Sequence, residues 1–298
     1  MRKEKKMLYT IENKVLKIAA DTSGAQLQSV YSKTTETEYL WQGDAAYWSG
    51  RAYNLFPIIG RMYKNTYTYA GNNYSLLCHG IARYRSFQLA DRTATKLVFR
   101  LTEDEDSLKA YPFRFVFTIS YEIKGAKLEI TYKVENTDEK ELIFALGGHP
   151  GFNVPFAHGN FENYYLEFTE QTRVALHTLS EKKFMTGETL PLPLTNGTRL
   201  PLQHELFDND AVILGNTCRS VSLKNKADSR SVTLRYPDFK YLGIWHTPKT
   251  DAPFVCVEPW SALPATDGKI DALENKADMN HLRAGGVYQT TWSIELSE

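Results

Sequence analysis

The sequence is poor in cysteine: 298 residues contain only Cys78, Cys218 and Cys256. Such an odd, sparse set cannot supply the disulfide framework of a small secreted protein, so it indicates reduced thiols and a cytoplasmic location. No apolar run is long enough to cross a membrane. Residues 1–6 are basic, but the stretch after them is amphipathic, so we predict no signal peptide. An alternative is that the functional chain begins at Met7 and that residues 1–6 are a disordered extension.

The sequence also has no excess of positive or negative charge, since 35 Lys and Arg residues balance 35 Asp and Glu residues. A chain without a net positive field is not expected to be a dedicated nucleic-acid binder. The sequence lacks the glycine-rich nucleotide-binding motifs, the G-x-S-x-G nucleophile motif, and the C-x-x-C and H-x-x-x-H spacings of metal sites. We therefore predict no cofactor and no metal, which leaves acid–base chemistry or simple binding.

Long helical patterns are scarce, and the dominant hydrophobic period is two. Residues 97–101, 113–121, 127–134, 164–168, 220–223, 231–236, 241–245 and 291–296 read as strands. Gly71 and Gly125 mark hairpin turns, and residues 104–111 predict a short helix that Pro112 ends. Without alternating strands and long helices, we expect an all-β fold, a large antiparallel β-sandwich that forms a single domain over residues 1–298.

Two acid–base candidates lie at strand-to-turn junctions. His149 is surrounded by glycines and prolines in the segment 146–155, and Glu258 ends the apolar run 254–257 just before Pro259. A histidine titrates near neutral pH, and a carboxylate is rarely buried without a partner, so the two could form an acid–base pair. The alternatives are a purely structural role for His149 and an ion pair of Glu258 with a cation such as Arg61.

Other polar residues are weaker candidates by themselves. Arg61 follows an apolar run and His79 lies beside a glycine, whereas Asp208 and Asp210 precede a strand of buried type. Trp245 could stack on the apolar face of a sugar, although most tryptophans belong to cores. Each residue also has an ordinary structural explanation, as a salt bridge, a turn former or a core side chain.

In their order along the chain, these motifs resemble the aldose 1-epimerase (galactose mutarotase) superfamily, and most of all its divergent bacterial LacX-type branch. The resemblance spans nearly the whole chain. It rests on residues 55–61, 79–80, 148–153, 206–211, 256–260 and 279–282.

The resemblance implies a galactose mutarotase-like β-sandwich with an open sugar-binding cleft. It implies that Glu258 is the general base and His149 the general acid, with Arg61 and His79 holding the sugar. Asp210 would bind sugar hydroxyls, with Asp208 as its rival because the sequence does not fix the register. Two departures bear on substrate specificity: Gly148 and Gly151 stand where a typical galactose mutarotase has asparagine and an aromatic residue, and Trp260 replaces its glutamine.

The predicted activity is thus the interconversion of the α and β anomers of an aldose, without cofactor. One alternative is a hexose-6-phosphate 1-epimerase, with Arg51, Arg83 and Arg85 as phosphate contacts. Another is a non-catalytic carbohydrate-binding or sensor protein. The expected partner is a small-molecule sugar, with no nucleic acid and no membrane, and the chain would be a monomer or a homodimer.

Overall fold

The computed structural model describes residues 6–298, and within them β-strands form five sheets. The two largest are antiparallel throughout, as predicted, and we name them the large sheet and the site sheet. The large sheet has the order β17 (Arg199–Pro201), β14 (Tyr164–Phe168), β19 (Ser220–Asn225), β20 (Ser231–Arg235), β25 (Val287–Ser297), β11 (Lys127–Asn136), β10 (Phe115–Lys124), β9 (Lys96–Thr102), β8 (Gln88–Arg92). The site sheet has the order β16 (Met185–Pro191), β15 (Ala175–Leu179), β18 (Val212–Gly215), β21 (Tyr241–Trp245), β22 (Phe254–Trp260), β13 (Gly147–Asn153), β5 (Ala52–Leu55).

The remaining elements are short. The three smaller sheets are β1 (Leu8–Glu12), β2 (Leu16–Asp21), β3 (Leu27–Ser32), β4 (Thr37–Glu38); β23 (Asp271–Ala272), β6 (Thr66–Tyr69), β7 (Asn72–Ser75); and β12 (Leu142–Phe144), β24 (Asn280–Leu282). The helical segments are α1 (Glu105–Ala110) and the 3-10 turns η1 (Tyr63–Asn65), η2 (Ala82–Tyr84), η3 (Phe161–Asn163), η4 (His204–Phe207), η5 (Leu273–Asn275). No helix among the described residues has the length and apolar character needed to cross a membrane.

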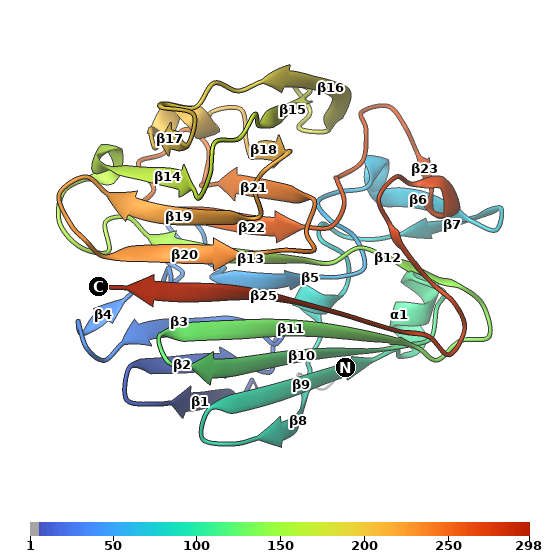
Figure 1. Cartoon of the computed structure of the whole chain (residues 1–298). Coiled ribbons are helices and arrows are strands. Elements are labelled where there is room, and N and C mark those ends of the chain that lie inside the picture. Colours follow the sequence, from blue (N-terminus) through green and yellow to red (C-terminus); the bar gives the residue numbers. More distant parts are fainter. Residues whose placement is uncertain (1–5) are drawn as a thin grey trace.

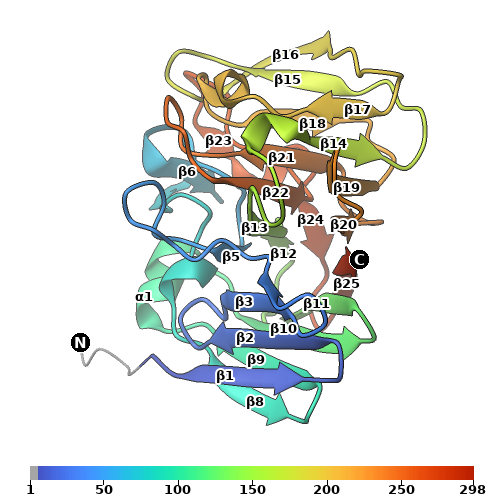
Figure 2. The same cartoon turned by 90° about the vertical axis from the view of Figure 1, so that its left-hand side faces the viewer.

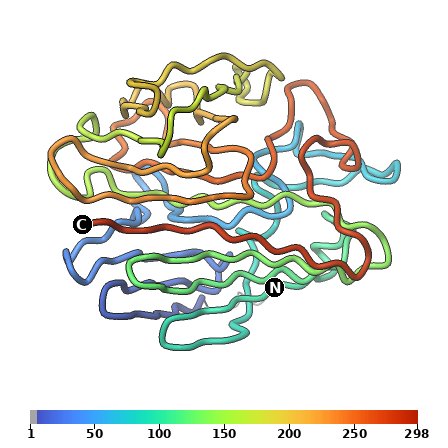
Figure 3. Tube along the Cα trace, in the orientation of Figure 1, coloured from blue at the N-terminus to red at the C-terminus, as the bar shows by residue number. Residues whose placement is uncertain are grey.

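The sheets are arranged in layers. In Figure 1 the large sheet faces the viewer, with the site sheet behind its upper part and β1–β4 behind its lower part. The view from the side shows the site sheet and the β1–β4 sheet following one another from top to bottom (Figure 2). The C-terminal strand β25, in red, runs through the middle of the large sheet (Figure 3). The expected β-sandwich is confirmed.

Alternation of side chains explains the central strands of the large sheet. On β10 every second residue from Phe115 to Ile123 is buried, and on β11 the residues from Leu128 to Val134 alternate in the same way. Successive side chains of a strand point to opposite faces, so one face of this hairpin supplies the core and the other meets solvent. The predicted turn at Gly125 is confirmed, because Lys124 pairs with Lys127 across it.

Most other predicted elements are also present. The helix predicted over 104–111 is α1, which Asp104 caps by accepting a hydrogen bond from the Ser107 amide. The strand predicted from residue 113 begins at Phe115 instead, because the Arg114 amide donates to the Asp138 side chain and not to a neighbouring strand. Of the extension predicted for residues 1–6, only Lys6 lies within the described residues, where it pairs with Asp21 at 2.7 Å.

Buried polar groups tie the two main sheets together. Asn54 on β5 is 2% exposed, and its Oδ1 accepts a hydrogen bond of 2.8 Å from the Tyr132 hydroxyl on β11. The hydrophobic core runs continuously from Ile11 to Leu296. The single domain predicted for residues 1–298 stays a prediction, which this continuity favours.

Candidate active site

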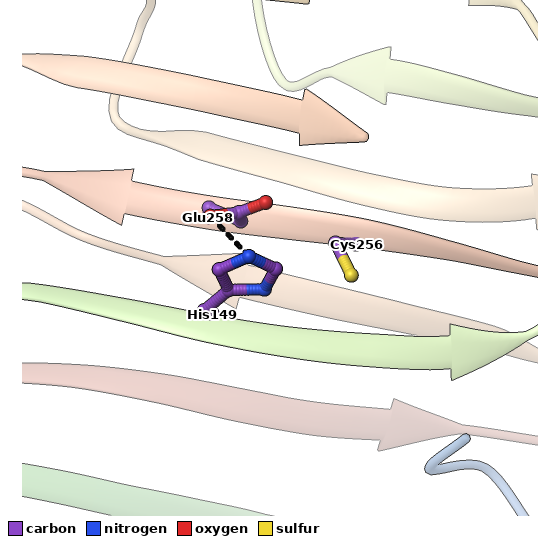
Figure 4. Close-up of side chains that lie close together, drawn as sticks. All are labelled: His149, Cys256 and Glu258. Atoms are coloured by element: carbon purple, nitrogen blue, oxygen red, sulfur yellow. Dashed lines mark ion pairs between the residues drawn. The ribbon is translucent and has the colours of Figure 1, made fainter. Parts of the chain in front are cut away.

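Strand register brings His149 and Glu258 together. β13 and β22 pair antiparallel, with Gly147 opposite Trp260 and Gly151 opposite Cys256, so position 149 lies across from position 258. Both side chains point away from the large sheet. The distance from His149 Nε2 to Glu258 Oε2 is 3.3 Å (Figure 4). Two residues that are 109 positions apart in the sequence are therefore direct cross-strand neighbours.

Glycines allow close packing around the strands that carry the site. An added Cβ at Gly148 would lie 2.5 Å from Cζ2 of Trp292 on β25, so the strand that carries His149 approaches the large sheet closely there. On β21, Gly243 is paired with Glu258, and its Cβ would lie 2.6 Å from Cζ2 of Trp260. The missing side chain at position 243 lets the Trp260 indole lie over β21.

The carboxyl group of Glu258 is almost completely buried. It is 1% exposed, and its Oε2 accepts a hydrogen bond of 3.2 Å from Trp260 Nε1. Burial raises the pKa of Glu258 well above its ordinary value, with a smaller contribution in the same direction from the charge of Asp210. The carboxyl group therefore keeps a proton to higher pH than a glutamate in water.

The imidazole of His149 is shifted in the opposite direction. Burial lowers the pKa of His149 to about 3, and the nearby Arg83 guanidinium acts in the same sense. Its Nδ1 has no hydrogen-bond partner among the described residues. Both shifts favour the uncharged pair, in which the carboxyl group holds one proton beside a neutral imidazole.

A cavity of about 250 Å³ opens over this pair. Six of the seven residues predicted for the site line it: Arg61, His79, His149, Asp210, Trp245 and Glu258. The seventh, Asp208, is exposed and lies outside the lining. The remaining lining residues are Trp48, Tyr53, Gly60, Cys78, Arg83, Leu179, Lys183, Ala211, Ile213, Trp260 and Pro264.

Two hydrogen bonds join His79 to Gly60, the residue before Arg61. The His79 amide donates to the Gly60 carbonyl at 2.7 Å, and the Gly60 amide donates to His79 Nδ1 at 3.1 Å. Since Nδ1 accepts a hydrogen bond, the neutral ring carries its proton on Nε2 and offers a donor. The Arg61 guanidinium lies 5.1 Å from the centre of the Phe184 ring and donates to the Lys183 carbonyl at 3.4 Å.

Asp210 is oriented by a tryptophan. Trp245 Nε1 donates to Asp210 Oδ1 at 2.9 Å, which leaves Oδ2 available to a ligand. Asp210 has a φ of 77°, a conformation that asparagine and aspartate tolerate better than most residues. The turn after η4 therefore directs Asp210 to the cavity, whereas Asp208, two residues earlier, is exposed.

An aromatic wall that we had not predicted surrounds the acid–base pair. The Trp48 ring stacks on His149 with 4.9 Å between centres and 27° between planes, and Tyr53 meets His149 edge-on at 5.8 Å. Tyr53 is paired with His149 in the β5–β13 register, but Trp48 comes from the loop before β5. Nothing in the sequence around Trp48 distinguishes it from a core tryptophan.

Of the three arginines considered as phosphate contacts, only Arg83 reaches the cavity. Its guanidinium lies 3.8 Å from the centre of the Tyr53 ring. Arg85 pairs instead with Asp104 at 2.9 Å. Arg51 donates to the Gln28 carbonyl at 2.8 Å. Lys183, which the sequence analysis did not single out, lines the cavity as a further cation.

Potential metal ligands also meet at this place. One donor atom each of His149, Cys256 and Glu258 lies within 4.8 Å of the other two (Figure 4). Cys256 and Glu258 are two residues apart on β22 and so share a face of the sheet. Sequence spacing did not reveal this cluster, since its histidine comes from the neighbouring strand.

Comparisons with known proteins find relatives that match most of the chain. A family described as aldose 1-epimerase matches residues 7–269. The chain is 30% identical over 283 residues to protein LacX, chromosomal, from Lactococcus lactis subsp. lactis, covering 91% of this chain and 93% of that protein. Two solved structures are similar throughout. A galactose mutarotase related enzyme from Lactobacillus acidophilus has a TM-score of 0.92 and 34% identity, with 98% of each chain covered. A galactose mutarotase-like protein from Lactobacillus casei has a TM-score of 0.93 and 32% identity, covering 98% of this chain and 100% of that one.

Proposed function

The chain belongs to the aldose 1-epimerase family, and we propose that it interconverts the α and β anomers of an aldose with Glu258 as the base and His149 as the acid. The observation that carries the proposal is their direct contact at 3.3 Å on the floor of a cavity. An acid and a base this close together can serve the two oxygens bonded to the anomeric carbon.

Ring opening requires two proton transfers. Glu258 takes the proton of the C1 hydroxyl while His149 gives a proton to the ring oxygen, and the C1–O5 bond breaks to leave an aldehyde. Rotation about the C1–C2 bond exposes the other face of the aldehyde, and ring closure reverses both transfers. Well-placed general acid and base groups typically contribute about 10²–10⁴-fold each.

The pKa shifts fit this cycle because the pair needs one proton in total. Before ring opening that proton is on His149, and after it a proton is on Glu258 while His149 is neutral. The uncharged state is the one that burial favours, through the raised pKa of Glu258 and the lowered pKa of His149. Opening from the uncharged pair is therefore preceded by transfer of the Glu258 proton to His149 across the 3.3 Å contact, and the opening step returns the pair to its uncharged state.

The other lining residues supply binding and orientation. The Nε2 hydrogen of His79 and the Arg61 guanidinium are donors for sugar oxygens, and Asp210 Oδ2 is an acceptor for hydroxyl groups. Trp245 donates a hydrogen bond to Asp210 through Nε1. We propose that the face of its ring packs against the apolar side of a pyranose. We propose Asp210 for the hydroxyl contact in preference to Asp208, which lies outside the cavity lining.

A second candidate substrate is a phosphorylated aldose. Arg61, Arg83 and Lys183 all line the cavity, and arginine and lysine side chains form strong charge-assisted hydrogen bonds with phosphate. With Arg51 and Arg85 engaged elsewhere, any phosphate group would have to be held by these three. The noncatalytic alternative, a carbohydrate-binding or sensor protein, would not require the His149–Glu258 contact.

Magnetisation-exchange NMR between the two anomers tests the proposal. A panel of free and 6-phosphorylated aldoses is measured with the wild type, Glu258→Gln, His149→Ala and Asp208→Asn. We expect exchange of one sugar to accelerate, and both pair variants to lose about 10²–10⁴-fold of that acceleration. Asp208→Asn, an exposed residue of the Asp210 loop, is the control that keeps it. Line broadening without faster exchange in the wild type would instead establish a binding protein.

Location and assembly stay predictions. We propose the cytoplasm as the location, on the odd and sparse set of cysteines in the sequence. We expect a monomer or a homodimer with a small-molecule sugar as its partner and with no affinity for nucleic acid. Sedimentation velocity of the purified chain measures the oligomeric state directly.

A further inference from the structure

Cys256 lies beside the acid–base pair but has no part in the proposed chemistry. It is fully buried, next to Trp41, Ala252 and Phe254, and it does not line the cavity. A thiol is not needed to open a hemiacetal ring. Its position is nevertheless specific. Cys256 lies on the same face of β22 as Glu258, and the neighbouring strand β13 places His149 opposite Glu258.

We propose that His149, Cys256 and Glu258 bind one zinc-type divalent ion, which competes with the sugar for the site. An imidazole, a thiolate and a carboxylate are the three ligand types that Zn²⁺ takes from proteins. Ligand distances of about 2.0–2.3 Å around a tetrahedral ion place donor atoms roughly 3.3–3.7 Å apart. The His149–Glu258 contact of 3.3 Å already matches, and the donor atoms of the cluster lie no more than 4.8 Å from one another (Figure 4).

Burial makes this cluster different from a surface group of acidic residues. The exposed fractions are 7% for His149, 0% for Cys256 and 1% for Glu258. The imidazole contacts Glu258 through Nε2. Its other nitrogen, Nδ1, is buried and has no hydrogen-bond partner among the described residues. Since His149 and Glu258 line the cavity, an ion can reach them from there.

The charges balance when the ion binds. Cys256 loses its thiol proton and Glu258 loses the proton of its carboxyl group, and both protons leave to solvent. His149 binds through the lone pair of a neutral nitrogen. One dication then meets two anions, so the buried site gains no net charge, and no oxidation or reduction takes place.

The fourth ligand position explains the competition with sugar. Three protein ligands leave one position of a tetrahedral ion open, and two of the three, His149 and Glu258, line the cavity from which a further ligand would come. The ion occupies the two groups that would carry out proton transfer, so it blocks them while it is bound. Metal binding itself does not depend on the proposed epimerase activity; only its effect on turnover does.

Direct metal binding by the purified, chelator-treated chain is the test. Co²⁺ is titrated while the thiolate-to-cobalt charge-transfer absorption is recorded, and Zn²⁺ binding is measured by equilibrium dialysis. The variants are Cys256→Ala and, as matched thiol controls, Cys78→Ala at the cavity and Cys218→Ala outside its lining. Circular dichroism confirms that each variant is folded.

We expect one ion per chain and a thiolate band in the wild type and in both controls. In Cys256→Ala the band should vanish, and the affinity should fall by at least the roughly 10–100-fold that loss of even an outer-shell partner costs. Zn²⁺ binding unchanged in Cys256→Ala, or no saturable binding by the wild type, would overturn the proposal. If the wild type also accelerates anomer exchange, Zn²⁺ should inhibit it far more strongly than it inhibits Cys256→Ala. Because binding is measured without sugar, a failure of the epimerase proposal leaves this result interpretable.

Discussion

Replacing Glu258 with glutamine should stabilise the protein relative to the wild type, and this difference should grow as the pH rises. The folded state holds a proton on this buried carboxyl group up to a pKa well above 4.5, whereas the unfolded chain releases it near 4.5. Between these two values the folded state binds one more proton than the unfolded state, so the free energy of unfolding falls with increasing pH. The amide of glutamine resembles the protonated acid but has no proton to lose.

The magnitude follows from a single proton. The wild type should lose up to about 1.4 kcal/mol per pH unit relative to Glu258→Gln, beginning above pH 4.5 and ending at the folded pKa of Glu258. Below pH 4.5 the carboxyl group is protonated in both states, so this contribution to the difference vanishes. Subtracting the curve of the variant from that of the wild type removes the titrations that the two proteins share.

Urea unfolding at a series of pH values between 2 and 8 measures the difference. Glu129→Gln is a control of opposite sign, because hydrogen bonds from Lys124 and Lys127 lower the pKa of Glu129. Its stabilising contribution is present above pH 4.5 and is lost as the pH falls through the folded pKa. Parallel stability curves for the wild type and Glu258→Gln over the whole range would refute the argument that burial raises the pKa of Glu258.

Three further predictions concern the site. Gly148→Ala should destabilise the protein by about 1–3 kcal/mol in urea or thermal unfolding, because its Cβ would lie 2.5 Å from the Trp292 ring; unchanged stability would show that the strand shifts at no cost. Trp245→Phe should weaken sugar binding in NMR titrations, since Asp210 loses the hydrogen bond that orients it, and an unchanged affinity would contradict this. Any enzyme-dependent anomer exchange should fall away on the acid side only near the His149 pKa of about 3; loss already near pH 6 would show that burial does not lower that pKa.

Local patterns were sufficient where one face of a strand is exposed. β10 and β11 show period-two alternation over most of their length, because each has a core face and a more exposed face, and both were predicted. In the strand β2 every residue except Lys17 is buried, so its sequence carries no sustained alternation and it was not predicted. A strand that is buried on both faces needs apolar residues at successive positions, so it lacks the alternation of apolar and polar residues from which strands are predicted.

The sequence by itself determined that this is an antiparallel β-protein of the aldose 1-epimerase type. It marked His149 by its glycine- and proline-rich surroundings and Glu258 by its place between an apolar run and Pro259. Only the tertiary structure decided that these residues touch, because the contact depends on the register of two strands about 100 residues apart. The same holds for Trp48, which reaches His149 from a loop, and for Cys256, whose donor atom comes near the pair only when β13 and β22 align. Strand pairing over such distances is set by the packing of the whole sandwich, and no local pattern records it.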